Sequence, residues 1–172
     1  MSDHKDSFQV DDVLVKFGKL YKIFQIKTKE IENKKVAYYK PIFIKNKRDE
    51  MICSIPLANI SQAFFRKPLS KTDYQEFLSN LSKKRESFKE KVLIKSFSDL
   101  SGSDNLEKKS LLLSHLWYRK QHPDINLSTS EQNLFADLIE SVLEELAFVL
   151  GLNLETAKKK IFSNLATKNI KE

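Results

Sequence analysis

Few side chains in this 172-residue sequence could carry chemistry, and they are scattered. The metal-binding types among them are His4, His115, His122 and Cys53. They do not cluster at the spacing of metal ligands, so we expect no metal and no bound cofactor. Cys53 lies in an apolar run and is expected to be a small buried side chain rather than a reactive thiol. No nucleophile elbow, glycine-rich phosphate loop or HExxH motif occurs, so we expect a protein that is not an enzyme.

Two adjacent carboxylates, Glu144 and Glu145, lie in a stretch with helical periodicity. Successive side chains of a helix diverge by about 100°, so these carboxylates cannot converge on one substrate atom as a catalytic pair. They are expected on a solvated face of the helix.

The strongest sequence signal for binding is a basic run before residue 101. Residues 1–60 and 61–100 each carry a net charge of +4, and residues 101–172 carry −1, so the first 100 residues hold all of the excess of +7. The densest stretch comprises Lys83, Lys84, Arg85, Lys89, Lys91 and Lys95. Such a run forms either a solvated helix face or a stripe that contacts phosphates.

The composition excludes several classes of protein. Hydrophobic residues make up 41% of the chain and charged residues 31%, which excludes a disordered tail. No apolar stretch approaches the roughly 18 residues of a membrane span, and the N-terminus has no apolar signal core. A single cysteine excludes an internal disulfide framework and fits a reducing compartment. We therefore expect a cytoplasmic, monomeric protein of one domain or two small ones.

Residues 8–65 predict a small, strongly bent antiparallel sheet or barrel. Short β-branched and aromatic runs are separated by polar turns at 32–35 and 46–49. Pro41 is expected at a strand edge or a strand start, because it cannot donate to a central ladder.

Residues 70–166 predict an all-helical domain, which makes the fold class α+β. Ser70 with Asp73 and Ser128 with Glu131 form capping boxes, the first of them imperfect. A second helix is expected at about 84–99, and a third is expected to start at Ser103 or Asp104 and to stop at the residues 122–124. Gly151 ends the helix that Ser128 begins, Asn153 caps the last helix, and Trp117 is expected in the core, since it shares a helical face with Leu113 and Leu116.

Five short segments, in this order, resemble the CarD family of bacterial regulators that bind RNA polymerase. They are Gln9–Val15 as a first strand, Ile55–Asn59 as a proline-containing strand end, Leu116–Arg119 as a Leu-Trp-x-Arg segment, and the capped helix of Leu127–Glu131 with Leu143–Ala147. The resemblance runs over about residues 8–150. It implies a Tudor-like N-terminal domain that docks on the RNA polymerase β subunit and a helical domain that contacts promoter DNA. A tryptophan of the family wedges into the minor groove at the upstream edge of the melted bubble and stabilises the open complex.

The resemblance also implies site residues for each partner. Lys29 falls where the family has an arginine that contacts the polymerase, with Lys27 beside it, and Ser54 falls where the family has a second such arginine. A lysine keeps the charge but lacks the bidentate fork of arginine. For DNA, Phe88 falls near the wedge tryptophan, and the basic residues around it are expected on phosphates: Lys84, Arg85, Lys89, Lys91 and Lys95. Gln132 and Asp137 occupy positions that are basic in some members.

Two other functions fit the same residues. One is a polymerase-binding interaction module that has lost the DNA contact, in which Phe88 is a core residue of its helix. The other is RNA binding by the Tudor-like domain, with Tyr38, Tyr39 and Phe43 as stacking aromatics. Aromatic residues in strands also fill cores, so this last prediction depends on their exposure.

Overall fold

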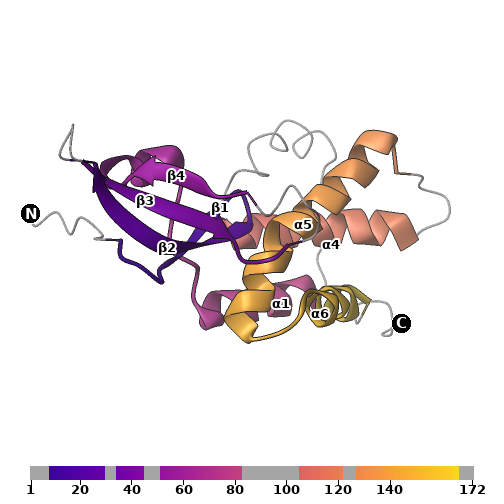
Figure 1. Ribbon diagram of the computed structural model, residues 1–172. Coiled ribbons are helices and arrows are strands. Elements are labelled where there is room, and N and C mark those ends of the chain that lie inside the picture. Colours follow the sequence, from indigo (N-terminus) through magenta and orange to yellow (C-terminus); the bar gives the residue numbers. More distant parts are fainter. Residues whose placement is uncertain (1–7, 30–33, 45–50, 83–104, 122–126, 167–172) are drawn as a thin grey trace, which may run out of the picture. The chain divides into compact units, whose positions relative to one another are not determined.

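The computed structural model describes residues 8–29, 34–44, 51–82, 105–121 and 127–166, and Figure 1 shows its ribbon. The chain divides into two compact units, residues 1–68 and residues 69–172. The described strands lie in the first unit and the described α-helices in the second, so the predicted α+β class is confirmed. In the described part of the chain, no helix is long and apolar enough to cross a lipid bilayer.

The N-terminal unit is built on one antiparallel sheet in which the strands follow each other in chain order. Its strands are β1 (Val13–Lys16), β2 (Lys19–Lys29), β3 (Lys34–Pro41) and β4 (Cys53–Pro56). The pairing of β2 with β3 shifts between Ile23 and Gln25, which marks a β-bulge that bends the long strand β2. The prediction for Pro41 was wrong, because Pro41 is the last residue of the interior strand β3. At a strand end its missing N–H removes no central ladder bond.

The main core cluster of this unit lies on one face of the sheet and consists of Leu14, Ile23, Ala37, Ile60 and Phe65. Val15, Leu20 and Val36 are also buried, although strand alternation places them on the other face. Two short 3₁₀ turns after β4, η2 (Leu57–Asn59) and η3 (Ser61–Ala63), bring Ile60 and Phe65 to the face of the main cluster. The chain then returns beside β1, where the Val15 N–H donates to the Arg66 carbonyl at 2.8 Å and the Arg66 N–H donates back at 3.1 Å.

The C-terminal unit contains four described helices. They are α1 (Lys71–Ser82), α4 (Leu106–Gln121), α5 (Thr129–Leu150) and α6 (Leu154–Ala166), labelled in Figure 1. Helix α5 packs against α1, α4 and α6, and α1 also packs against α4 and α6. The largest fully buried side chains of this core are Tyr74, Phe77, Leu81, Leu112, Leu113, Leu116, Leu138 and Leu146.

The helix starts follow the capping chemistry that the sequence predicts. Ser70 and Asp73 bond reciprocally at the start of α1, the Asp73 N–H to the Ser70 hydroxyl at 3.1 Å and the Ser70 N–H to the Asp73 carboxylate at 2.8 Å. The capping box of Ser128 and Glu131 is confirmed at the start of α5. Asn153 caps α6 by accepting the Thr156 N–H at 2.7 Å.

Two other helix boundaries were tested by the structure. Gly151 ends α5 in the left-handed conformation, with a φ of 66°, as predicted. The expected start of the third helix at Ser103 or Asp104 was wrong by one or two residues, because Asn105 caps α4 through the Lys108 N–H at 2.9 Å. The expected helix at 84–99 lies outside the described residues.

The prediction of a solvated face for Glu144 and Glu145 was wrong. Glu144 is 4% exposed and Glu145 is 1% exposed, and every residue from 141 to 147 is buried. This part of α5 is enclosed because three helices pack around it. The Glu145 carboxylate accepts the Leu69 N–H at 2.7 Å, which fixes the segment that leads into α1.

Candidate functional site

The residues predicted to bind the polymerase lie on two strands of the sheet. Lys27 and Lys29 are on β2, near the end that leads to β3, and Ser54 is on the edge strand β4. Lys29 is the last residue of β2 and pairs in register with Lys34. Because β3 lies between β2 and β4, the strand pairing decides whether these positions share a face.

Two neighbouring rows of residues cross the sheet at this point. One row joins Gln25, Tyr38 and Ser54 across β2, β3 and β4. The next row joins Ile26, Ala37 and Ile55, which belong to the core or pack against it. Successive side chains of a strand point to opposite faces, so the row of Ser54 points away from this core. Lys27 is two residues beyond Gln25 and shares that outer face.

Tyr38 connects the two predicted contact residues, and sequence reasoning assigned it to another function. The Lys27 ammonium lies 5.8 Å from the centre of the Tyr38 ring, within the range of a cation–π contact. Tyr38 is also the register partner of Ser54. We call Lys27, Tyr38 and Ser54 the outer-face cluster.

A second pair of the same kind lies further along the outer face. The Lys40 ammonium is 5.9 Å from the centre of the Phe24 ring, at the β-bulge. Lys40 stands directly opposite Lys22 in the register, and like charges at such positions repel. Lys22 forms an ion pair with Asp11 at 2.7 Å, but the face keeps an excess of positive charge. Such a face favours an acidic partner.

The aromatic residues proposed for RNA stacking do not form one surface. Tyr39 packs edge-on against Tyr21, with ring centres 5.5 Å apart, and against Phe65 at 5.1 Å. Burial, followed by the neighbouring Cys53 and Tyr21, raises the pKa of the Tyr39 phenol above its ordinary value of 10.0. Tyr39 is therefore part of the core side of the sheet, whereas Tyr38 is on the outer face and Phe43 is half-buried after the end of β3. This separation disfavours the RNA-stacking hypothesis in the form predicted.

The residues predicted to bind DNA all lie between positions 83 and 104, outside the described residues. They are Lys84, Arg85, Phe88, Lys89, Lys91 and Lys95. Gln132 and Asp137, at positions that are basic in some CarD members, lie on α5 within the described residues. Both side chains are exposed. The Gln132 amide donates to the Leu127 carbonyl at 3.0 Å, so this side chain supports the entry to its own helix.

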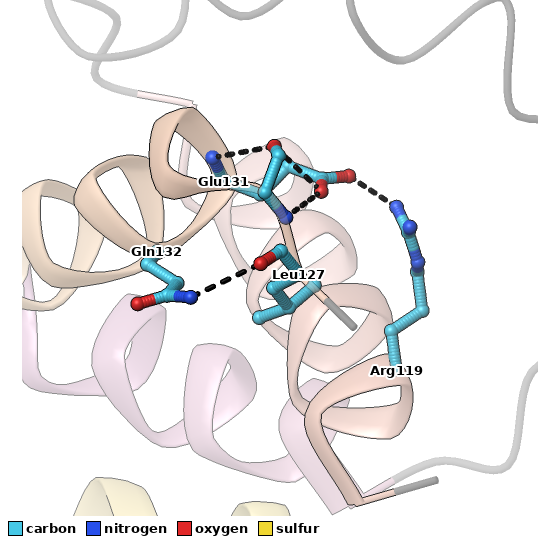
Figure 2. A network of polar contacts seen from close by, with 5 residues as sticks. Arg119, Leu127, Glu131 and Gln132 are labelled. Carbon is cyan, nitrogen blue, oxygen red and sulfur yellow. Dashed lines mark hydrogen bonds and ion pairs between the residues drawn. The ribbon is translucent and has the colours of Figure 1, made fainter. Parts of the chain in front are cut away.

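A network of polar contacts joins the end of α4 to the start of α5, and Figure 2 shows it. Arg119 of α4 forms an ion pair with Glu131, and the other oxygen of Glu131 accepts the Ser128 N–H at 2.8 Å and the Ser128 hydroxyl at 2.9 Å. Burial of Glu131 acts to raise its pKa, but the bonds from Ser128 and the charge of Arg119 outweigh it and hold the pKa below its ordinary value of 4.5. Ser128 and Glu131 bond reciprocally and Arg119 pairs with Glu131, so the network is a structural joint between two helices.

Beside this joint lies an aromatic cluster formed by α4, α5 and α6. The Trp117 ring stacks on Phe135, with centres 6.2 Å apart and planes at 21°, and lies 5.6 Å from Phe162. Trp117 thus packs among helices as predicted. Among the described residues, its buried indole N–H finds no hydrogen-bond partner.

An open, partly acidic pocket also lies in the C-terminal unit. Its lining residues are Leu69, Asp73, Glu76, Phe77, Asn80, Leu106 and Glu107. Three carboxylates in this wall repel phosphate, so the pocket does not suit DNA.

The described residues offer little for metal chemistry. Among them, no three His, Cys, Asp or Glu side chains lie close enough together to hold a metal ion. Cys53, expected to be buried, is only half-buried beside Tyr39.

Neither a scan against models of known protein families nor a search of curated proteins finds a match to this chain. The likeness to the CarD family therefore remains a prediction from sequence motifs.

Proposed function

We propose that the chain is a CarD-like transcription regulator without enzymatic activity. Its N-terminal unit docks on the β subunit of a bacterial RNA polymerase, and its helical unit contacts promoter DNA and stabilises the open complex. The observation that carries the docking half is the outer-face cluster, because Lys27 and Ser54 come from different strands and share one face beside Tyr38. As a partner of the polymerase, the protein acts in the cytoplasm.

The chemistry of this face indicates what it recognises on the polymerase. Lys22, Lys27 and Lys40 supply positive charge, and Phe24 and Tyr38 supply apolar area beside two of these ammonium groups. Aromatic residues are enriched at the centres of protein interfaces, and complementary charge around them directs association. The partner surface is therefore acidic and has an apolar centre.

Reversing the charge of Lys27 tests the docking half. The change Lys27→Glu in the full chain is expected to weaken binding to purified RNA polymerase about tenfold or more, because it removes the cation over Tyr38 and repels an acidic partner. Binding is measured by biolayer interferometry on immobilised polymerase at fixed salt.

The matched control for this experiment is Lys35→Glu. Lys35 is exposed and pairs with Thr28, one row from Lys27, so its side chain points to the opposite face of the same sheet. This variant has the same net charge as Lys27→Glu and is expected to bind within about twofold of the native chain. Equal losses in both variants would assign the effect to overall charge and contradict docking through the outer face.

The DNA half depends on residues outside the described part of the chain. The double change Phe88→Ala with Lys89→Ala is expected to shorten the lifetime of the polymerase–promoter open complex severalfold, because it removes the stacking ring and a phosphate contact. The lifetime is measured after a heparin challenge, with the variant's affinity for polymerase measured in parallel. An unchanged lifetime at unchanged affinity favours the alternative of an interaction module without DNA contact.

A further inference from the structure

Two exposed phenylalanines form an aromatic knob on the N-terminal unit, in a part of the sheet that the proposed docking face does not use. Phe17 is 60% exposed and Phe64 is 74% exposed, and their ring centres lie 6.2 Å apart. They come from distant parts of the chain, the turn between β1 and β2 and the residue after η3. We call this pair the aromatic knob. Phe17 precedes the first residue of β2, and Lys27 of the outer-face cluster lies near the other end of that strand, so the knob is separate from the outer-face cluster.

Both residues of the knob have strained backbones. Phe17 has a φ of 50° and precedes Gly18, at 78°, in a two-residue hairpin turn, where asparagine is the usual residue before glycine. Phe64 has a φ of 61°. A bulky residue in the left-handed region costs about 1 kcal/mol or more, and such strain concentrates at functional sites. A large apolar ring kept exposed at two such positions points to a binding role.

The sequence on either side of the two rings is basic. Residues 13–21 and 60–70 contain Lys16, Lys19, Arg66 and Lys67 and no acidic residue. Lys22, which follows, forms an ion pair with Asp11 and belongs to the outer face. The Lys16 ammonium lies 5.6 Å from the centre of the Phe17 ring and 4.9 Å from that of Phe65. Lys19 stands opposite Lys16 at the base of the hairpin. An occupant of this surface therefore presents a flat apolar group together with negative charge.

Unpaired nucleotides have this combination of properties. Proteins bind single strands with exposed aromatic rings, on which bases stack, beside basic side chains that contact phosphates. About three quarters of the Phe64 surface is open to an incoming base. A lipid surface fits less well, because insertion of the Phe17 ring would carry the adjacent Lys16 ammonium toward hydrocarbon.

We propose that the aromatic knob binds single-stranded DNA, with a base stacked on Phe64 and phosphates held by Lys16, Lys19 and their basic neighbours. The choice of DNA over other single strands rests on the proposed function, in which the protein acts at a melted promoter. Stacking on Phe64 needs no polymerase, so it can be tested on the chain alone.

The test measures the affinity of the full chain for a fluorescently labelled oligothymidylate, by anisotropy at low salt, and for a duplex of equal length. The lysine-rich stretch near residue 90 also attracts phosphates, so the quantity of interest is the ratio of single-strand to duplex affinity. Phe64→Ala is expected to lower this ratio about tenfold, the loss of one stacked base. Phe64→Leu keeps the apolar area without a π-face and is expected to lose nearly as much, whereas Phe64→Trp keeps or raises the ratio.

Two further variants control for changes in folding and for the loss of an exposed apolar side chain. Phe64→Gly removes the ring and also relieves the left-handed strain, so it loses binding in a protein at least as stable as the native chain. Ile52→Ala removes another exposed apolar residue of the same unit and is expected to leave the ratio unchanged. The proposal is overturned if Phe64→Ala has the same ratio of single-strand to duplex affinity as the native chain.

The same measurements separate the other occupants. Full affinity in Phe64→Leu identifies an apolar protein contact, and tighter binding of oligouridylate than of oligothymidylate identifies RNA; each contradicts the proposal. Failure of the native chain to bind polymerase overturns the docking function, but the loss of oligothymidylate binding in Phe64→Ala still supports stacking on the knob. The two hypotheses can therefore fail separately.

Discussion

Replacing Glu131 with alanine is expected to lower the free energy of unfolding of the helical unit by about 3 kcal/mol. The change removes the capping box of α5, worth about 1 kcal/mol, and the charged partner of Arg119, worth about 2 kcal/mol. The Arg119 side chain is 16% exposed, so water replaces its lost partner only in part. Urea denaturation followed by circular dichroism measures the loss.

An exposed ion pair elsewhere in the same unit provides the control. Glu155 and Lys159 are separated by 2.7 Å on the surface of α6, and both side chains are at least 75% exposed. Glu155→Ala is expected to cost less than about 0.5 kcal/mol. A loss as large as that of Glu131→Ala would mean that burial and capping do not distinguish the two carboxylates.

The difference in stability between the native chain and Glu131→Ala depends on pH, and this dependence identifies the charge of Glu131 as the cause of the loss. Its pKa is lower in the folded state than in the unfolded chain, so the unfolded state binds the proton first as the pH falls. The stability from ionised Glu131 is complete above its ordinary pKa of 4.5 and is lost as the pH falls through the lower folded value. The gap between native chain and variant is therefore expected to shrink in acid. Asp73, whose pKa is also lowered, acts with the same sign in both proteins and does not affect the gap.

The second large loss of stability is expected on replacing the buried Glu145. Glu145→Ala is expected to destabilise the helical unit by about 3 kcal/mol, because the Leu69 N–H loses its acceptor and a cavity forms in the centre of the unit. Hydrogen exchange at Leu69 provides a local measurement beside the urea midpoint. We expect the Leu69 amide to lose protection more than the amides in the middle of α5.

Two further variants identify the reason for the loss of stability in Glu145→Ala. Glu145→Gln keeps an oxygen that can accept the Leu69 N–H, so it is expected to cost less than the alanine change. Asp137 lies on the exposed side of the same helix, and Asp137→Ala is expected to change stability by no more than about 0.5 kcal/mol. A glutamine variant as unstable as the alanine variant would show that the charge, rather than the hydrogen bond, is required.

The sequence predicts local structure well wherever short-range chemistry decides it. Ser128 with Glu131, Ser70 with Asp73 and Asn153 all cap the helices they are expected to cap, because a cap involves only three or four neighbouring residues. The α+β class follows from the change in hydrophobic period near residue 70. The register of the sheet did not follow from the sequence, so the position of Tyr38 between Lys27 and Ser54 emerged only from the fold.

The sequence predictions that failed share a common cause, which is tertiary packing. Glu144 and Glu145 were expected in solvent because periodicity assumes one buried face, but α5 has helices on several sides and is enclosed near its end. The meeting of Phe17 with Phe64 is equally absent from local pattern, since it depends on two positive φ values and on the return of the chain after η3. Functional surfaces made by distant segments require the fold.

The placement of the chain's single tryptophan gives a built-in optical reporter. Trp117 lies in the helical unit, stacked on Phe135 and close to Phe162, so its ultraviolet emission senses the packing of that unit. The N-terminal unit has no tryptophan. Emission excited near 295 nm therefore follows the melting of the helices alone, and its midpoint, set beside that of the whole chain, shows whether the two units unfold together or in sequence.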